Sequence, residues 1–251
     1  MWIPRRFSAV LLAALLTGGA AEAATLTVLA PASATPGAQA LAAQFGRQTG
    51  TTVTVAGGSR DKILAILKAG GPADVVILPT ADLITLPTVN GMVPLGHIPV
   101  GVAVKAGARV PDVSTPEKFR KTLLAAKGVA YADPAVGTSA GKVIDRVLSG
   151  PDFTGVKRVP VQGLAVTGLT SGRADIALQM LPELMTDQTV ALAGPVPEPY
   201  GASVDFAAGI AGVSENSVNA EAFISFITTP TAAAVWKAHG VAQLGQLPAT
   251  P

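Results

Sequence analysis

The sequence predicts an α/β fold in which short apolar strands alternate with amphipathic helices. Two observations carry this prediction: strand-length apolar runs recur along the chain, and helix-start signals follow several of them. A third is the run DVVIL at 74–78, which is almost entirely apolar, as expected of a strand whose two sheet faces are both covered by helices. A chain of 251 residues is long enough for one large domain or two smaller lobes.

The first part of the chain reads as three strands separated by two helices. Thr35-Pro36 is typical of a helix cap followed by proline in the first turn, and Gly50 is a typical helix end. Apolar residues spaced three and four apart between Ala38 and Phe45 give that helix one buried face. In chain order we expect a strand at 26–30, a helix at 35–49, a strand at 52–56, a helix at 61–69 and a strand at 74–78.

The rest of the chain continues the alternation. The sequence STPE at 114–117 indicates another capped helix, and three prolines between 195 and 199 indicate an extended crossing segment. We expect strands at 98–105, 129–132, 156–159, 175–179 and 204–210, and helices that begin at 116 and span 138–148, 221–228 and 231–239. No linker divides the chain, so two lobes would have to be joined by strands that cross between them twice.

The composition excludes several classes of function. Cysteine is absent and histidine occurs only at His97 and His239, which excludes thiol catalysis, iron–sulfur clusters and Cys/His zinc sites. Basic residues number 18 against 16 acidic ones, without the basic stripe that nucleic-acid binding needs. Asp74, Asp133 and Asp175 lie at predicted strand ends, where we expect them to bind the backbone of adjacent loops. We therefore expect no cofactor, no resident metal and no nucleic-acid partner.

Residues 1–23 have the pattern of a secretory signal peptide. Arg5 and Arg6 supply the positive start, 7–16 is apolar, and Ala21-Glu22-Ala23 fits a cleavage site. No later stretch is long and apolar enough to span a bilayer. We expect export, with cleavage after Ala23.

Three loops that should connect a strand to a helix are rich in small and hydroxyl residues. They are ASAT at 32–35, GGSR at 57–60 and GTSAG at 137–141. In open α/β sheets, ligands bind beyond the carboxyl ends of the strands, where helix N-termini present unpaired N–H groups. Three such ends could surround one anion. The alternative is that each serine or threonine only caps its own helix.

The segment GTSAG also fits the G-x-S-x-G pattern of serine hydrolases, with Ser139 as the nucleophile. Residues 133–136 lie between the predicted strand and the GTSAG segment, whereas the hydrolase turn follows its strand directly. His239 is the one histidine that follows Ser139 in the chain, and it lies near a predicted helix end. A secreted serine hydrolase is thus the alternative function.

Several segments together resemble the periplasmic solute-binding proteins of ABC transporters, in the molybdate-binding family. They are TVLAPAS at 27–33, AGGPADVVI at 69–77, AYADP at 130–134 followed by SAG at 139–141, and AFISFI at 222–227 with WKAHG at 236–240. The resemblance implies a two-lobed type II periplasmic binding protein, each lobe a mixed sheet flanked by helices. It implies lobe boundaries at 24–102 plus 205–251 and at 103–204, with a hinge of two crossing strands.

The resemblance also implies a function and a set of site residues. The protein would be a periplasmic monomer without enzymatic activity that binds a small anion and delivers it to an ABC permease in the inner membrane. Ser33 matches the family's oxyanion-binding serine, and Arg60 stands where a second serine is usual. Met180 replaces a tyrosine. The expected ligand-binding residues are Ala32, Ser33, Ser59, Arg60, Thr138, Ser139, Ala140 and Gln179.

The departures at Arg60 and Met180 bear on the ligand. A guanidinium can donate two parallel hydrogen bonds to a planar carboxylate, whereas methionine cannot replace a tyrosine hydroxyl. Gln179 can both donate and accept. The candidates are a molybdate- or tungstate-like anion, bound as an oxyanion, and a small organic carboxylate. We predict that at least one organic acid binds more tightly than molybdate. The alternative for Arg60 is an exposed position beside Asp61.

Overall fold

The computed structural model describes residues 25–242, so the predicted signal peptide and its cleavage site lie outside the described residues. Within them, no helix has the length and apolar character needed to cross a membrane. The strands are β1 (Thr25–Pro31), β2 (Thr52–Gly58), β3 (Val75–Pro79), β4 (Val89–Lys105), β5 (Val129–Ala132), β6 (Arg158–Val161), β7 (Ile176–Met180), β8 (Val190–Pro195) and β9 (Ser203–Ala211).

Helices occupy most of the remaining described chain. They are α1 (Thr35–Thr49), α2 (Arg60–Lys68), α3 (Thr80–Leu83), α4 (Pro116–Ala125), α5 (Ser139–Leu148), α6 (Val166–Thr170), α7 (Leu181–Thr186), α8 (Ser217–Ile227) and α9 (Pro230–Ala238), with 3-10 turns η1 (Pro134–Val136) and η2 (Pro151–Phe153). Their alternation with the strands is the α/β arrangement that the sequence predicts.

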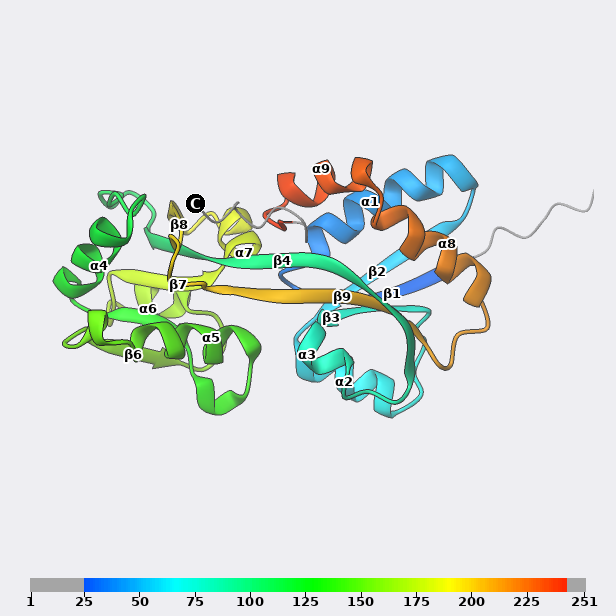
Figure 1. Ribbon diagram of the computed structural model, residues 1–251, viewed down its shortest axis with the longest axis horizontal. Helices are drawn as coiled ribbons and strands as arrows, with labels where there is room; N and C mark the ends of the chain where they lie inside the picture. The colour runs from blue at the N-terminus through cyan, green and yellow to red at the C-terminus, as the bar shows by residue number, and fades with distance from the viewer. Residues whose placement is uncertain (1–24, 243–251) are drawn as a thin grey trace, which may run out of the picture.

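The strands form two mixed sheet regions that share the long strand β4 (Figure 1). The order along the sheet is β2-β1-β3-β9-β4-β7-β5-β6, with β8 paired to β4 off this path. β4 pairs with β9 from Val89 to Pro99 and then with β7 and β8 from Val100 to Lys105. β1, β2 and β3 are parallel, as are β5, β6 and β7. The fold is thus the predicted two-lobed one.

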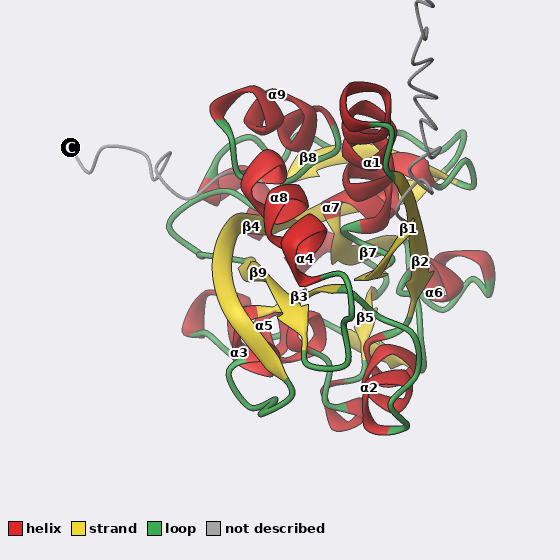
Figure 2. Ribbon diagram, turned by 90° about the vertical axis from the view of Figure 1, so that its right-hand side faces the viewer, coloured by secondary structure: helices red, strands yellow, loops and turns green. Residues whose placement is uncertain are grey.

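The first sheet region contains β2, β1, β3, β9 and the first part of β4. Helices lie on both of its faces, which explains why β3 is apolar throughout (Figures 1 and 2). On one face α1 packs against α8 and α9. Phe45 of α1 contacts Phe223 edge-to-face, with ring centroids 5.3 Å apart. The buried Trp236 of α9 donates its indole N–H to the Ile227 carbonyl oxygen. On the other face, Ile63 and Leu67 of α2 join a second buried cluster.

The structure corrects three details of the predicted strands. β4 begins at Val89 rather than at 98, because two irregularities in its pairing with β9 break the strand pattern. β6 continues through Pro160 to Val161, which is possible because β5 is the one described strand that pairs with β6, so β6 is an edge strand of the described sheet. The proline-rich segment after β8 is a loop, and the strands that run between the sheet regions are β4 and β9 (Figure 1).

Candidate ligand-binding site

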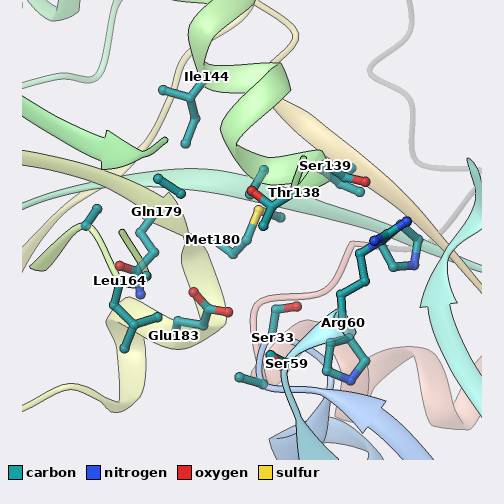
Figure 3. Close-up of a pocket in the computed structure, with 18 of the residues that line it drawn as sticks. Ser33, Ser59, Arg60, Thr138, Ser139, Ile144, Leu164, Gln179, Met180 and Glu183 are labelled. Carbon is teal, nitrogen blue, oxygen red and sulfur yellow. The ribbon is translucent and has the colours of Figure 1, made fainter. Parts of the chain in front are cut away.

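A cavity of about 380 Å³ lies where the two sheet regions meet, and residues from both regions line it (Figure 3). The cavity brings together all eight residues that the sequence analysis singles out. They are Ala32, Ser33, Ser59, Arg60, Thr138, Ser139, Ala140 and Gln179. The three small-residue loops therefore end at one place, as expected for loops at the carboxyl ends of neighbouring strands.

The turn between β1 and α1 presents Ser33 to the cavity. The N–H of Ala34 donates to the Pro31 carbonyl oxygen at 2.9 Å, and this tight turn buries Ser33, whose hydroxyl points into the cavity (Figure 3). The predicted cap at Thr35 is wrong. The turn runs directly into α1, so Thr35 is already helical, and its hydroxyl donates back to Pro31 at 2.9 Å.

The loop between β2 and α2 combines a helix cap with an ion pair. Ser59 caps α2 by accepting a hydrogen bond from the Lys62 N–H at 3.3 Å. Arg60 lines the cavity, but its Nη2 binds Asp82 at 2.7 Å and its Nη1 binds Asp61 at 3.2 Å. One N–H of each of these two nitrogens is thus engaged by a carboxylate of the protein, and the two carboxylates also offset the guanidinium charge.

The loop before α5 presents backbone donors. The Thr138 hydroxyl accepts from the Gly141 N–H at 3.1 Å and so caps α5. Ser139 and Ala140 occupy the first two helical positions, where N–H groups have no acceptor inside the helix, and both residues line the cavity. A bound anion at this helix end would accept from them and would also be favoured by the helix dipole.

The same loop does not have the geometry of a serine hydrolase. The 3-10 turn η1 separates β5 from Ser139, so the serine does not follow its strand directly. Both histidines belong to the described residues, and neither lines the cavity. His97 exchanges backbone hydrogen bonds with Ala242, and His239 is the residue that ends α9. Ser139 therefore has no histidine in the cavity to act as its base.

Gln179 and Glu183 form the polar part of the opposite wall. Gln179, at the end of β7, is buried, and its side-chain oxygen accepts from the Val166 N–H at 3.4 Å. Glu183 lies four residues further along the chain, in the short helix α7. Burial raises the pKa of the Glu183 carboxyl to about 7, although a hydrogen bond with Gln179 acts in the opposite direction. The rest of this wall is apolar, with Ile144, Leu164, Leu178 and Met180.

Glu183 is absent from the predicted site residues because the helix that carries it, α7, is only six residues long and was not predicted. A signal was present, since Leu181-Pro182-Glu183 follows the strand predicted at 175–179 after one intervening residue. Proline with an acidic residue in the first turn is a helix-start signal of the kind used for the other loops. Among the described residues, no group of histidine, cysteine, aspartate or glutamate side chains is arranged to hold a metal ion.

Comparisons with known proteins agree with this architecture. Residues 26–242 match the family model described as bacterial extracellular solute-binding protein. Two solved structures share the fold. One is the substrate-binding domain of a molybdenum ABC transporter from Clostridium difficile, with a TM-score of 0.70 and 16% identity, covering 88% of this chain and 100% of that one. The other is the periplasmic molybdate-binding protein of Azotobacter vinelandii, with a TM-score of 0.67 and 22% identity over 87% and 99% of the two chains.

A curated relative of similar length is an enzyme. The chain is 26% identical over 255 residues to an aconitate isomerase from a Pseudomonas species, covering 97% of this chain and 96% of the relative.

Proposed function

We propose that this chain, which belongs to the family of bacterial extracellular solute-binding proteins, is the periplasmic component of an ABC importer for a small organic acid. The observation that carries the proposal is the make-up of the cavity. One side offers the Ser33 hydroxyl and the N-terminus of α5 to negative charge, while the other side is largely apolar. The apolar side of the cavity can bury the carbon skeleton of an organic anion.

The size of the cavity supports an organic acid over a tetrahedral oxyanion. A volume of 380 Å³ is about a dozen times the share of a water molecule in the liquid, roughly 30 Å³. An oxyanion such as molybdate has one central atom and four oxygens, so it would leave much of this space to water. A di- or tricarboxylate would fill more of the cavity and would bury its carbons against Leu164 and Met180.

The relative named for its action on aconitate, an unsaturated tricarboxylate, supports the same class of ligand. A tricarboxylate could place one carboxylate at the α5 N-terminus and another at Ser33, in reach of two sets of donors on different loops. Arg60 would then act mainly through its remaining charge, because Asp61 and Asp82 hold its terminal nitrogens.

We expect an organic tricarboxylate to stabilise the protein in a thermal-shift screen and to bind more tightly than molybdate, sulfate or phosphate by calorimetry. A ligand at a hundred times its Kd adds about 2.7 kcal/mol of stability. Ser33→Ala should weaken binding by about 1 to 3 kcal/mol, because a charged acceptor loses a donor. Ser225→Ala, on the exposed side of α8, is the matched control. Submicromolar molybdate binding unmatched by any carboxylate would contradict the proposal.

The second candidate function is isomerisation of such an acid, and the position of Glu183 favours it. Moving a double bond along a carbon chain requires a base that removes a proton from one carbon, after which a proton is returned to another. A carboxyl with a pKa of about 7 in an apolar wall can do both near neutral pH. Proton NMR of cis-aconitate mixed with the protein would show the trans isomer at a rate that Glu183→Gln abolishes. Unchanged cis-aconitate would exclude this activity.

We further propose that the lobes are 24–102 with 205–251 and 103–204, and that they close on the ligand about the paired strands β4 and β9. Both strands continue from one sheet region toward the other, and their pairing ends at Pro99 and Ser203. Small-angle scattering should therefore show a smaller radius of gyration with saturating ligand than without it. Identical curves with a ligand that calorimetry shows to be bound would contradict a hinge.

A further inference from the structure

We propose that Glu183 takes up a proton when the site fills, so that an anionic ligand enters the cavity together with one proton. In the complex the neutral carboxyl donates a hydrogen bond to a ligand oxygen. This inference rests on the proposed function, because it requires an anion to bind in this cavity. It assigns Glu183 as a ligand-binding residue and makes the affinity of the protein depend on pH.

The position of Glu183 places its carboxyl against the ligand space. Figure 3 shows the carboxyl pointing into the cavity from one side, while the Ser33 hydroxyl points into it from the other. Gln179 is the polar neighbour of Glu183 on its own wall, and the apolar Leu164 and Met180 flank it. An anion held by Ser33 and the α5 N-terminus would therefore face the Glu183 carboxyl directly.

The side-chain amide of Gln179 is oriented so that its NH₂ group can donate to Glu183. Its side-chain oxygen accepts the Val166 N–H, which leaves the amide NH₂ free to point the other way. The Glu183 carboxyl can accept from that NH₂ in either protonation state. When protonated, it has one O–H left to donate, and the ligand is the natural acceptor.

Among the described residues that pack on α7 or line the cavity, no free cation offsets an ionised Glu183. The elements packed most extensively on α7 are β4, β7 and β8, and of these only β4 has ionisable residues, His97 and Lys105. His239 precedes the glycine that lies against α7. None of these three side chains lines the cavity. Arg60 does line it, but two aspartates hold its guanidinium.

The charge state of the free site follows from this environment. Because burial raises the pKa of Glu183 to about 7, the free site near neutral pH is a mixture of protonated and ionised forms. A bound anion would repel the ionised form, and this repulsion raises the Glu183 pKa further in the complex. The anion therefore selects the protonated form. Binding is at full strength below the pKa of the free site and weakens as the pH rises above it.

The expected size of the effect follows from the same pKa. With a free-site pKa of about 7 and a protonated complex, the Kd rises about tenfold for each pH unit well above 7. Between pH 7 and pH 9 the affinity should fall about fiftyfold. Proton uptake per bound ligand should rise from about one half at pH 7 to nearly one at pH 9.

The test is calorimetry with trans-aconitate between pH 7 and pH 9, where the carboxylates of this probe are fully ionised. Titrations in two buffers of different ionisation enthalpy, neither a carboxylate nor a phosphate, give the number of protons taken up. Glu183→Gln, which keeps the shape and a donor, should bind with a Kd that is independent of pH. Glu221→Gln, at an exposed position of α8, is the control and should keep the parent's pH profile.

Each result has a definite meaning. If trans-aconitate, citrate and malate give no binding heat or thermal shift at any pH, both the proposed function and this inference fail. If a carboxylate binds without proton uptake, only the inference fails. Glu183 would then be ionised in the complex, which is the state that a base in the isomerase candidate requires. A pH dependence that persists in a folded Glu183→Gln protein also overturns the inference. If Glu183→Gln does not fold, the parent's proton uptake alone decides.

Discussion

Ala140→Asp is expected to weaken the binding of an organic anion at least a hundredfold while leaving the fold intact. Ala140 is the second residue of α5 and lines the cavity, so the new carboxylate would stand beside the bound anion. Like charges brought together at a binding site cost several kcal/mol, and a hundredfold change in Kd corresponds to about 2.7 kcal/mol. An acidic residue in the first turn of a helix is favourable for the helix itself.

Calorimetry and thermal melting of the same Ala140→Asp sample separate these two effects. Ala140→Asn is the matched control, because it has nearly the same size without the charge, and it should lose much less affinity. The melting temperature of the ligand-free Ala140→Asp protein should equal or exceed that of the parent. Unchanged affinity in Ala140→Asp would show that the α5 N-terminus does not contact the ligand, so that Ser33 would not share the ligand with this helix.

The sequence could bring the predicted loop residues together at one cavity because the loops that line it share a repeated local pattern. Each small-residue loop lies between a strand and a helix, and parallel strands bring their carboxyl ends to one edge. Ser33, Ser59 and Thr138 could therefore be placed together without any knowledge of side-chain contacts. The capping alternative was also correct in part, since Ser59 and Thr138 cap their own helices while lining the cavity.

The state of Arg60 could not be predicted in this way. Its partner Asp82 is 22 positions further along the chain, in the four-residue helix α3, which the sequence pattern does not reveal. Short helices give too few residues to show a period. The same limit hid α7 and with it Glu183. The side chains that could not be predicted therefore lie on short helices, whose position depends on packing rather than on periodicity.

For the three strand-end aspartates, the sequence predicted the kind of contact but not every partner. Each was expected to bind the backbone of adjacent loops, and each accepts backbone N–H groups, although only Asp133 does so close by in the sequence. Asp133 accepts from the Ala135 N–H at 2.9 Å, and Asp175 accepts from the N–H groups of Lys127 and Gly128. A carboxylate at a strand end is close to backbone donors that the sheet leaves unpaired. Asp74 additionally accepts from two side chains of a distant segment.

Asp74→Ala is expected to lower the free energy of unfolding by about 2 to 4 kcal/mol. One carboxylate oxygen of Asp74 accepts from the Thr27 N–H at 2.7 Å, and the other accepts from the Ser214 hydroxyl at 2.7 Å and from the Asn216 amide at 3.3 Å. The residue is buried and so joins β1 to the segment after β9. Alanine would leave these donors without their acceptor, and a buried unsatisfied group costs about 1 to 3 kcal/mol.

Urea denaturation of the ligand-free protein measures this loss, and the linear slope shows whether the transition remains two-state. Glu215→Ala, at an exposed position of the same segment, is the control and should stay within about 0.5 kcal/mol of the parent. Asp74 does not line the cavity, so Asp74→Ala should bind its ligand with the parent's affinity well below its melting temperature. A loss of less than about 1 kcal/mol would mean that water replaces the carboxylate for all three donors, and that the connection between β1 and the segment after β9 depends on packing instead.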